Sequence, residues 1–207
     1  MATPVVTPRV AAALGIAVTL GALALFGLSG PSNAAKKAGA TATKSATPTT
    51  KPSYNVEDPY EAPGFVDLQN WVNSKPLQLA DLKGKVVLIN FWTFGCINCR
   101  NTIPNMKDLY AKYHDKGFEI VGIEAPEFDY EKEAAGVAKA VKELGITWPV
   151  ASDNRWKTWR QYKSAYWPGF FYLDKTGKVR HTHVGEGGYK KSHEVVAALL
   201  AEPAPAP

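Results

Sequence analysis

The two cysteines of the chain, Cys96 and Cys99, lie three residues apart. At this spacing in the first turn of a helix, both side chains face the same side and can close a small disulfide ring. Unpaired backbone N–H groups and the helix dipole stabilise an anion at the position of the first sulfur. We therefore expect Cys96 to be a thiolate nucleophile. Cys99, nearer the helix interior, would be shielded and suited to resolving a mixed disulfide.

Two other uses of paired cysteines are a structural disulfide and half of a zinc site. A disulfide that closes so short a loop contributes little chain entropy to stability, which disfavours a purely structural role. A tetrahedral zinc site would need two further soft ligands. The four histidines do not form a metal-spaced cluster near the pair. The sequence thus predicts a redox-active disulfide with no metal and no organic cofactor.

The cysteine pair follows a continuous apolar run at residues 86–92, which is typical of a strand buried on both faces. We expect a helix from Cys96 or Ile97 to about residue 114 and a second buried strand at 118–123. The remaining expected elements are a helix at 130–144 that Gly145 ends, a short strand at 148–151, a short helix at 156–162, strands at 170–173 and 179–184 around a turn, and a helix at 192–201. This order predicts an α/β fold with a mixed central sheet.

Composition bounds the class of protein. The 207 residues are 45% hydrophobic and 21% charged, as in a globular protein. The net charge of +5 forms no basic stripe and is not interleaved with aromatic residues, so nucleic-acid binding is not expected.

The N-terminal part of the chain has the composition of an export signal. Residues 11–35 carry no charge and are largely apolar, and small residues around Ala34 fit a cleavage site. The apolar run is also nearly long enough to span a membrane, so residues 1–34 are expected to be either a signal peptide or an N-terminal anchor. Either reading places the rest outside the cytoplasm. Residues 35–53 read as a flexible Ala/Thr/Pro/Lys linker, 54–201 as the folded domain, and 202–207 as a disordered tail.

The residues around the cysteines resemble the thioredoxin superfamily, specifically its exported TlpA/ResA-like branch. The resemblance rests on Asn90-Phe91-Trp92 before the cysteine pair, on Pro104, and on Trp167-Pro168 before a strand. It also rests on the segment 125–128, which is similar to the thioredoxin-like domains of DipZ-type proteins. The resemblance covers residues 54–201 and implies a thioredoxin fold, with a mixed sheet flanked by helices and Pro168 in the cis form facing the cysteines.

The resemblance also implies a substrate-binding surface. The backbone of Trp167, held by Pro168, would pair with an extended substrate segment. Phe94 and Trp167, with Tyr166, would border an apolar groove. Ile97 and Asn98 lie between the cysteines, where they would touch substrate and tune the redox potential.

Two positions depart from thioredoxin itself. Ile97-Asn98 replaces Gly-Pro, so the direction of electron flow stays open. Asn90 replaces the buried Asp that takes the proton of the resolving thiol, and an amide cannot titrate. Glu127 matches the acidic residue that this branch places beside its cysteines, and we expect it to accept the proton of Cys99. The alternative is that Glu127 is a solvated loop carboxylate.

Together these features predict an extracytoplasmic thiol–disulfide oxidoreductase that acts on cysteine-containing exported proteins. The branch implies a reductant that keeps cytochrome or other exported thiols reduced and that draws electrons from a membrane partner. Three alternatives stay open. They are an oxidant that inserts disulfides, a peroxidase with its cysteine in a Thr-x-x-Cys context, and a copper-delivery protein, which would need Cys-x-x-x-Cys and a distant His.

Overall fold

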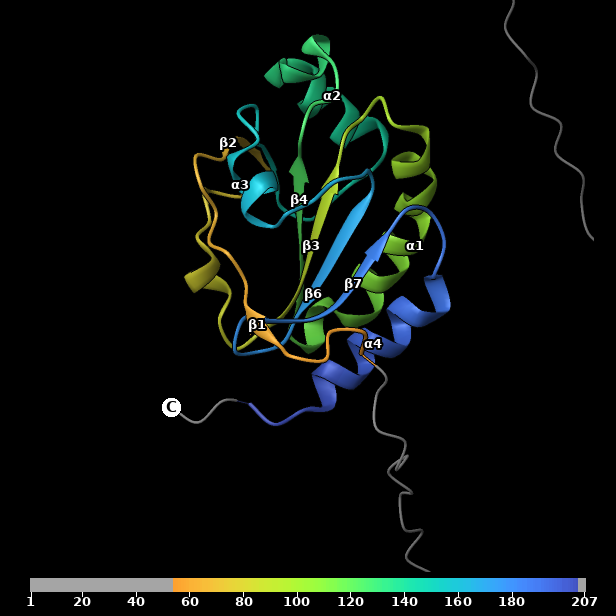
Figure 1. Ribbon diagram of the computed structural model, residues 1–207. Helices are drawn as coiled ribbons and strands as arrows, with labels where there is room; N and C mark the ends of the chain where they lie inside the picture. The colour runs from red at the N-terminus through yellow and green to blue at the C-terminus, as the bar shows by residue number, and fades with distance from the viewer. Residues whose placement is uncertain (1–53, 205–207) are drawn as a thin grey trace, which may run out of the picture. The chain divides into compact units, whose positions relative to one another are not determined.

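The computed structural model describes residues 54–204. They form one seven-stranded mixed sheet in the order β1-β7-β6-β3-β4-β5-β2 (Figure 1). The strands are β1 (Tyr60–Glu61), β2 (Gln69–Val72), β3 (Val86–Trp92), β4 (Phe118–Glu124), β5 (Val150–Ser152), β6 (Gly169–Leu173) and β7 (Lys178–Val184). The predicted signal or anchor at 1–34 and the linker at 35–53 lie outside the described residues. Within 54–204, no helix is both long enough and apolar enough to cross a membrane.

Strand β3 is the centre of the sheet and carries the cysteine pair at its carboxyl end. It runs parallel to β4 and antiparallel to β6. All seven of its residues are buried, as the uninterrupted apolar run predicts. The parallel register sets Trp92 beside Glu124, so the ends of β3 and β4 meet at one edge.

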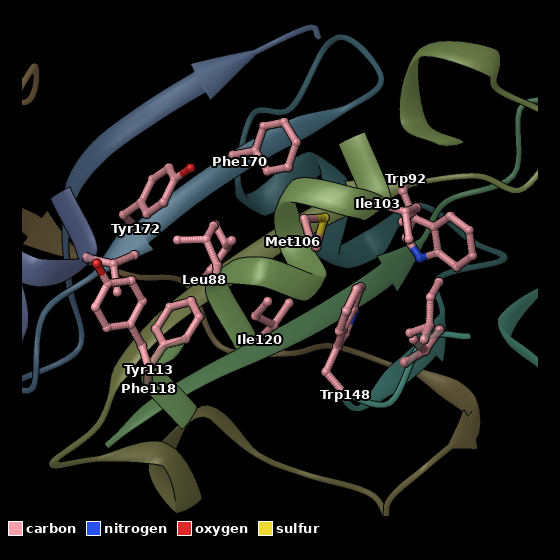
Figure 2. Close-up of a cluster of buried hydrophobic side chains, with 14 of the residues drawn as sticks. Leu88, Trp92, Ile103, Met106, Tyr113, Phe118, Ile120, Trp148, Phe170 and Tyr172 are labelled. Carbon is pink, nitrogen blue, oxygen red and sulfur yellow. The ribbon is translucent and has the colours of Figure 1, made fainter. Parts of the chain in front are cut away.

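Helices cover both faces of this sheet. On one face of the sheet, Leu88 of β3 shares a core with three helices, α1 (Ile97–Tyr113), α2 (Ala134–Glu143) and α4 (Tyr189–Ala201). On the opposite face, the short helix α3 (Lys157–Gln161) and the residue after it pack around Phe91. Figure 1 shows α1 and α4 on one side of the sheet and α3 on the other. Met106 of α1 lies over Leu88 and Ile120 in Figure 2, which fixes α1 across the two central strands.

The expected elements are confirmed except at four places. The short strand expected at 148–151 lies at Val150–Ser152 instead. The helix expected from residue 130 begins at Ala134, because residues 129–132 form a separate short 3-10 helix, η3 (Asp129–Lys132), whose Glu131 turns into the protein. The last helix begins at Tyr189 rather than at residue 192. The short strands β1 and β2 were not expected, since two and four residues are too few to show a period in sequence.

An ion-pair network joins the first described residues to the last. The Arg180 guanidinium donates to Asp174 at 2.9 Å and to both oxygens of Glu202 at 2.8 and 3.0 Å. Glu202 also accepts from the Tyr54 hydroxyl at 2.9 Å. Glu202, the first residue of the predicted disordered tail, is thus held to the domain by these bonds.

We expect Arg180→Met to lower the free energy of unfolding by about 2 kcal/mol, because it leaves two carboxylates without their main partner. Lys178→Met is the matched control, since Lys178 pairs with Glu61 at 3.7 Å on the surface. The control should lose less than about 0.5 kcal/mol. Urea unfolding of both variants checks this. Equal losses would mean that the Arg180 network contributes no more than a surface pair.

Candidate active site

Cys96 occupies the N-cap position of α1, directly after the turn that follows β3. Its backbone is extended, with φ −74° and ψ 115°, and its sulfur accepts a hydrogen bond from the Cys99 backbone N–H at 3.2 Å. Cys96 is half-buried, whereas Cys99 is 0% exposed. Both are free thiols in this structure. The geometry matches the expectation of an accessible nucleophile and a shielded resolving thiol.

Burial raises the pKa of the Cys99 thiol well above its ordinary value, and a hydrogen bond with Cys96 raises it further. A backbone hydrogen bond from Thr93 opposes the shift without cancelling it. Cys99 therefore holds its proton near neutral pH. A base must remove this proton before Cys99 can attack a mixed disulfide.

The Trp167–Pro168 bond is cis, as the resemblance predicts. Pro168 is buried, and the Trp167 indole donates to the Ala125 carbonyl at 2.9 Å. The Trp167 ring also lies against Trp159, with centroids 4.5 Å apart. The loop before β6 is thus fixed to the segment that follows β4.

Next to the dithiol lie one charged side chain, Arg100, whose guanidinium donates to the Phe94 carbonyl at 3.4 Å, and several apolar or neutral polar side chains. Ile97 is 65% exposed and Asn98 is exposed, whereas Phe94 is half-buried and packs against the core together with Cys96. Tyr166, before the cis bond, is 66% exposed. These residues leave large apolar groups open to a binding partner.

Glu127 does not lie in an apolar pocket. Its side chain is exposed, and its backbone N–H donates to Glu131 at 2.6 Å. The exposed side chain fits the alternative of a solvated loop carboxylate better than the expected role as proton acceptor of Cys99. The segment 125–128 turns the side chain outward so that the backbone can bind the Glu131 carboxylate.

The buried carboxyl group that the sequence analysis missed is Glu124, the last residue of β4. It is 0% exposed, and its Oε1 accepts from the Thr93 hydroxyl at 3.2 Å. Its Oε2 has no hydrogen-bond partner among the described residues. Burial raises the pKa of Glu124 to about 8, the Thr93 hydrogen bond lowers it in part, and Glu131 and Asp153 raise it again. The buried run extends one residue beyond the strand expected at 118–123, and Glu124 is that additional residue.

Thr93 connects this carboxyl to the dithiol. Its backbone bonds Cys99 and its hydroxyl bonds Glu124. Thr93 also stands three residues before Cys96, so the Thr-x-x-Cys spacing of the peroxidase alternative is present in this chain. The hydroxyl is committed to Glu124, however, and this arrangement favours dithiol chemistry.

We expect Glu124→Gln to change how stability depends on pH. The folded pKa of about 8 exceeds the ordinary value of 4.5, so wild-type stability falls as pH rises from 4.5 to 8 and levels off above. Glutamine does not titrate. The stability of Glu124→Gln relative to wild type should therefore rise by about 2 to 4 kcal/mol across that range.

Urea unfolding of the reduced proteins at several pH values measures this difference. Glu143→Gln is the control, because the Glu143 side chain is 61% exposed and its removal should give a flat difference. A flat difference for Glu124→Gln as well would show that Glu124 ionises normally in the folded protein.

Comparison with known proteins shows the family to which this chain belongs. The model of the AhpC/TSA family matches residues 60–182, which include β1 to β6 and most of β7. Protein DipZ of Mycobacterium tuberculosis is 42% identical over 147 residues, which are 70% of this chain and 21% of DipZ. The chain thus spans about a fifth of that relative.

Two further proteins match over most of their own length. The thiol-disulfide oxidoreductase ResA of Bacillus anthracis is 40% identical over 128 residues, which cover 61% of this chain and 69% of ResA. A thiol:disulfide interchange protein of the thioredoxin family from Chlorobium tepidum superposes with a TM-score of 0.59 at 27% identity, over 70% of this chain and 98% of its own. Because the family match covers more than half of the chain, with six strands, most of β7 and the turn that carries both cysteines, this chain belongs to the AhpC/TSA family, with the thioredoxin fold.

Proposed function

We propose that this chain is a thiol–disulfide oxidoreductase that reduces disulfides in exported proteins. The observation that carries the proposal is the pairing of an accessible Cys96 sulfur at the start of α1 with a buried Cys99 one turn into the same helix. The names of the relatives ResA and the Chlorobium interchange protein support the same chemistry.

The reaction transfers two electrons from the dithiol to the substrate. The Cys96 thiolate attacks one sulfur of a substrate disulfide, and the other sulfur leaves as a thiolate that takes up a proton. Cys99 then loses its proton and attacks the Cys96 sulfur. The Cys96–Cys99 disulfide forms, and the second substrate thiol is released. A reduced electron donor returns the pair to the dithiol.

Glu124 is the proton acceptor in the second step. Cys99 needs a base because burial holds its proton. Asn90 cannot act as one, and its amide is used by the Phe91 and Gly169 carbonyls. Glu124 has one unpaired oxygen among the described residues and a pKa raised to about 8. Thr93 bonds Glu124 through its hydroxyl and Cys99 through its backbone. A carboxylate with such a pKa can take a proton and release it again near pH 7.

The site of action is outside the cytoplasm, and the reductant is a membrane electron-transfer protein. The uncharged apolar run at residues 11–35 and the polar linker after it support this placement. The substrates are cysteine-containing exported proteins, among them cytochrome thiols. The reduction potential of the 96–99 pair separates a reductant from an oxidant, because a low potential favours donation of electrons. A direct peroxide assay tests the peroxidase alternative.

Cys99→Ser should accumulate a mixed disulfide with substrate, whereas Cys96→Ser should accumulate none. Without Cys99 the first step proceeds and the release step cannot. Non-reducing electrophoresis with insulin as the substrate measures the trapped species. Equal trapping by the two variants would contradict the assignment of Cys96 as the nucleophile.

Glu124→Gln should slow release of a preformed mixed disulfide by roughly 100-fold at neutral pH, because no carboxylate then takes the Cys99 proton. The rate should approach that of wild type at alkaline pH, where hydroxide serves instead. Stopped-flow release across pH gives both values.

Glu127→Gln is the matched control, since it removes an exposed carboxylate from the same segment. Its rate and pH profile should equal those of wild type. A slow Glu127→Gln with a normal Glu124→Gln would return the proton-accepting role to Glu127.

A further inference from the structure

The Glu131 carboxylate joins the dithiol turn to the segment 126–131. Glu131 is 0% exposed. Its Oε1 accepts from the Gly95 N–H at 3.0 Å, and its Oε2 accepts from the N–H groups of Glu127 and Phe128 at 2.6 and 2.9 Å. One oxygen therefore holds the residue before Cys96, and the other holds the neighbouring segment. Three N–H donors compensate the cost of burying this carboxylate.

The segment that Glu131 holds exposes two aromatic rings beside the site. Phe128 is 53% exposed and Tyr130 is 58% exposed, and their rings are stacked at 5.8 Å and 7°. Tyr130 in turn meets Phe94 edge to face at 5.8 Å. We call these three residues the aromatic stack. Contiguous exposed apolar groups of this kind mark binding surfaces on soluble proteins.

The aromatic stack is in close contact with the dithiol turn. A Cβ at Gly95 would overlap both the Glu131 carboxylate and the Tyr130 hydroxyl. The other end of the stack rests on α2, where a Cβ at Gly136 would come within 3.3 Å of the Phe94 ring. The absence of a side chain at Gly95 lets Tyr130 approach the turn that carries Cys96. The absence of one at Gly136 lets the Phe94 ring lie against α2.

We propose that the aromatic stack binds an apolar side chain that flanks the reacting cysteine of a protein substrate, and that Glu131 is the positioning residue that holds the stack beside Cys96. This inference rests on the proposed function, since the occupant must bring a disulfide to Cys96. An extended polypeptide segment satisfies this requirement, because its neighbouring side chains then reach the surface next to the nucleophile.

The charges beside the aromatic stack limit which side chains the substrate segment can carry next to its cysteine. Glu127 precedes the two exposed rings and is itself exposed, whereas the Asp129 carboxylate is paired with Lys132 at 2.6 Å. The Glu127 carboxylate interacts electrostatically with Tyr130 and repels an acidic side chain placed against that ring. The preferred substrate therefore carries an aromatic or large aliphatic residue next to its cysteine, and not an Asp or Glu.

The test compares three disulfides as substrates of the reduced protein. Two are synthetic peptide disulfides that differ only in having Phe or Asp beside the cysteine, and the third is hydroxyethyl disulfide, which has no flanking side chain. Wild type should reduce the Phe peptide with a kcat/KM roughly tenfold above that of the Asp peptide, mostly through KM.

Phe128→Ala, Tyr130→Ala and Glu131→Gln should each reduce this preference severalfold, and should lose far more rate with the Phe peptide than with hydroxyethyl disulfide. In Glu131→Gln one oxygen is replaced by an amide nitrogen, so either the turn or the segment loses its acceptor. Glu133→Gln removes an exposed charge nearby and should keep the wild-type preference. The two alanine variants change exposed rings, so they test the surface even if Glu131→Gln does not fold.

A wild type that reduces both peptides equally would overturn the inference and leave the proposed function standing. Variants that lose rate equally with all three disulfides would also overturn it, because the stack would then support only the fold or the chemistry. A wild type that reduces none of the three would overturn the proposed function itself, and this inference with it.

Discussion

The hydrogen bond from the Cys99 backbone N–H to the Cys96 sulfur places the first sulfur where a helix would otherwise leave a donor unpaired. That bond exists only because β3 delivers the chain to the start of α1 at the edge where β3 and β4 end together. The core between α1 and the two central strands then fixes the helix, and with it the difference in exposure between the two thiols. A shift of α1 along the sheet would remove both the acceptor geometry and the shielding of Cys99.

Three buried carboxyl groups lie near the dithiol, and they differ in how many hydrogen bonds offset the cost of their burial. Asp153 accepts backbone N–H bonds from Lys157 and Trp159, and Glu131 accepts three such bonds. Glu124 accepts one hydroxyl, with its second oxygen unpaired among residues 54–204. Hydrogen bonds stabilise a buried carboxylate, and Glu124, which has the fewest of the three, has its pKa raised to about 8 mainly by burial. The backbone hydrogen bonds of Asp153 and Glu131 hold α3 and the dithiol turn in place.

The sequence predicts correctly those features that depend on residues adjacent in the chain. The buried strand β3, the cysteine pair at the start of a helix and the proline before β6 all carry their signal in adjacent residues. Glu124 was missed because the expected strand stopped at residue 123, one position short of a burial that depends on the neighbouring strand. Glu131 was missed because it falls in a segment that was expected to be the start of a helix. Its inward turn follows from a contact with Gly95, which is distant in the chain. Glu127 was chosen by resemblance, which does not say which way a loop side chain points.

The hydrogen-bond network around Glu202 holds the two ends of the domain close together. Because Tyr54 and Arg180 both bind Glu202, the first and last stretches of the described residues 54–204 are held together. The two ends of the described domain therefore lie close together in space. Such a unit can be spliced into a longer polypeptide, or rejoined and reopened elsewhere as a circular permutant, without pulling the sheet apart. In Protein DipZ the matched region is 21% of a longer chain, which is compatible with such an insertion.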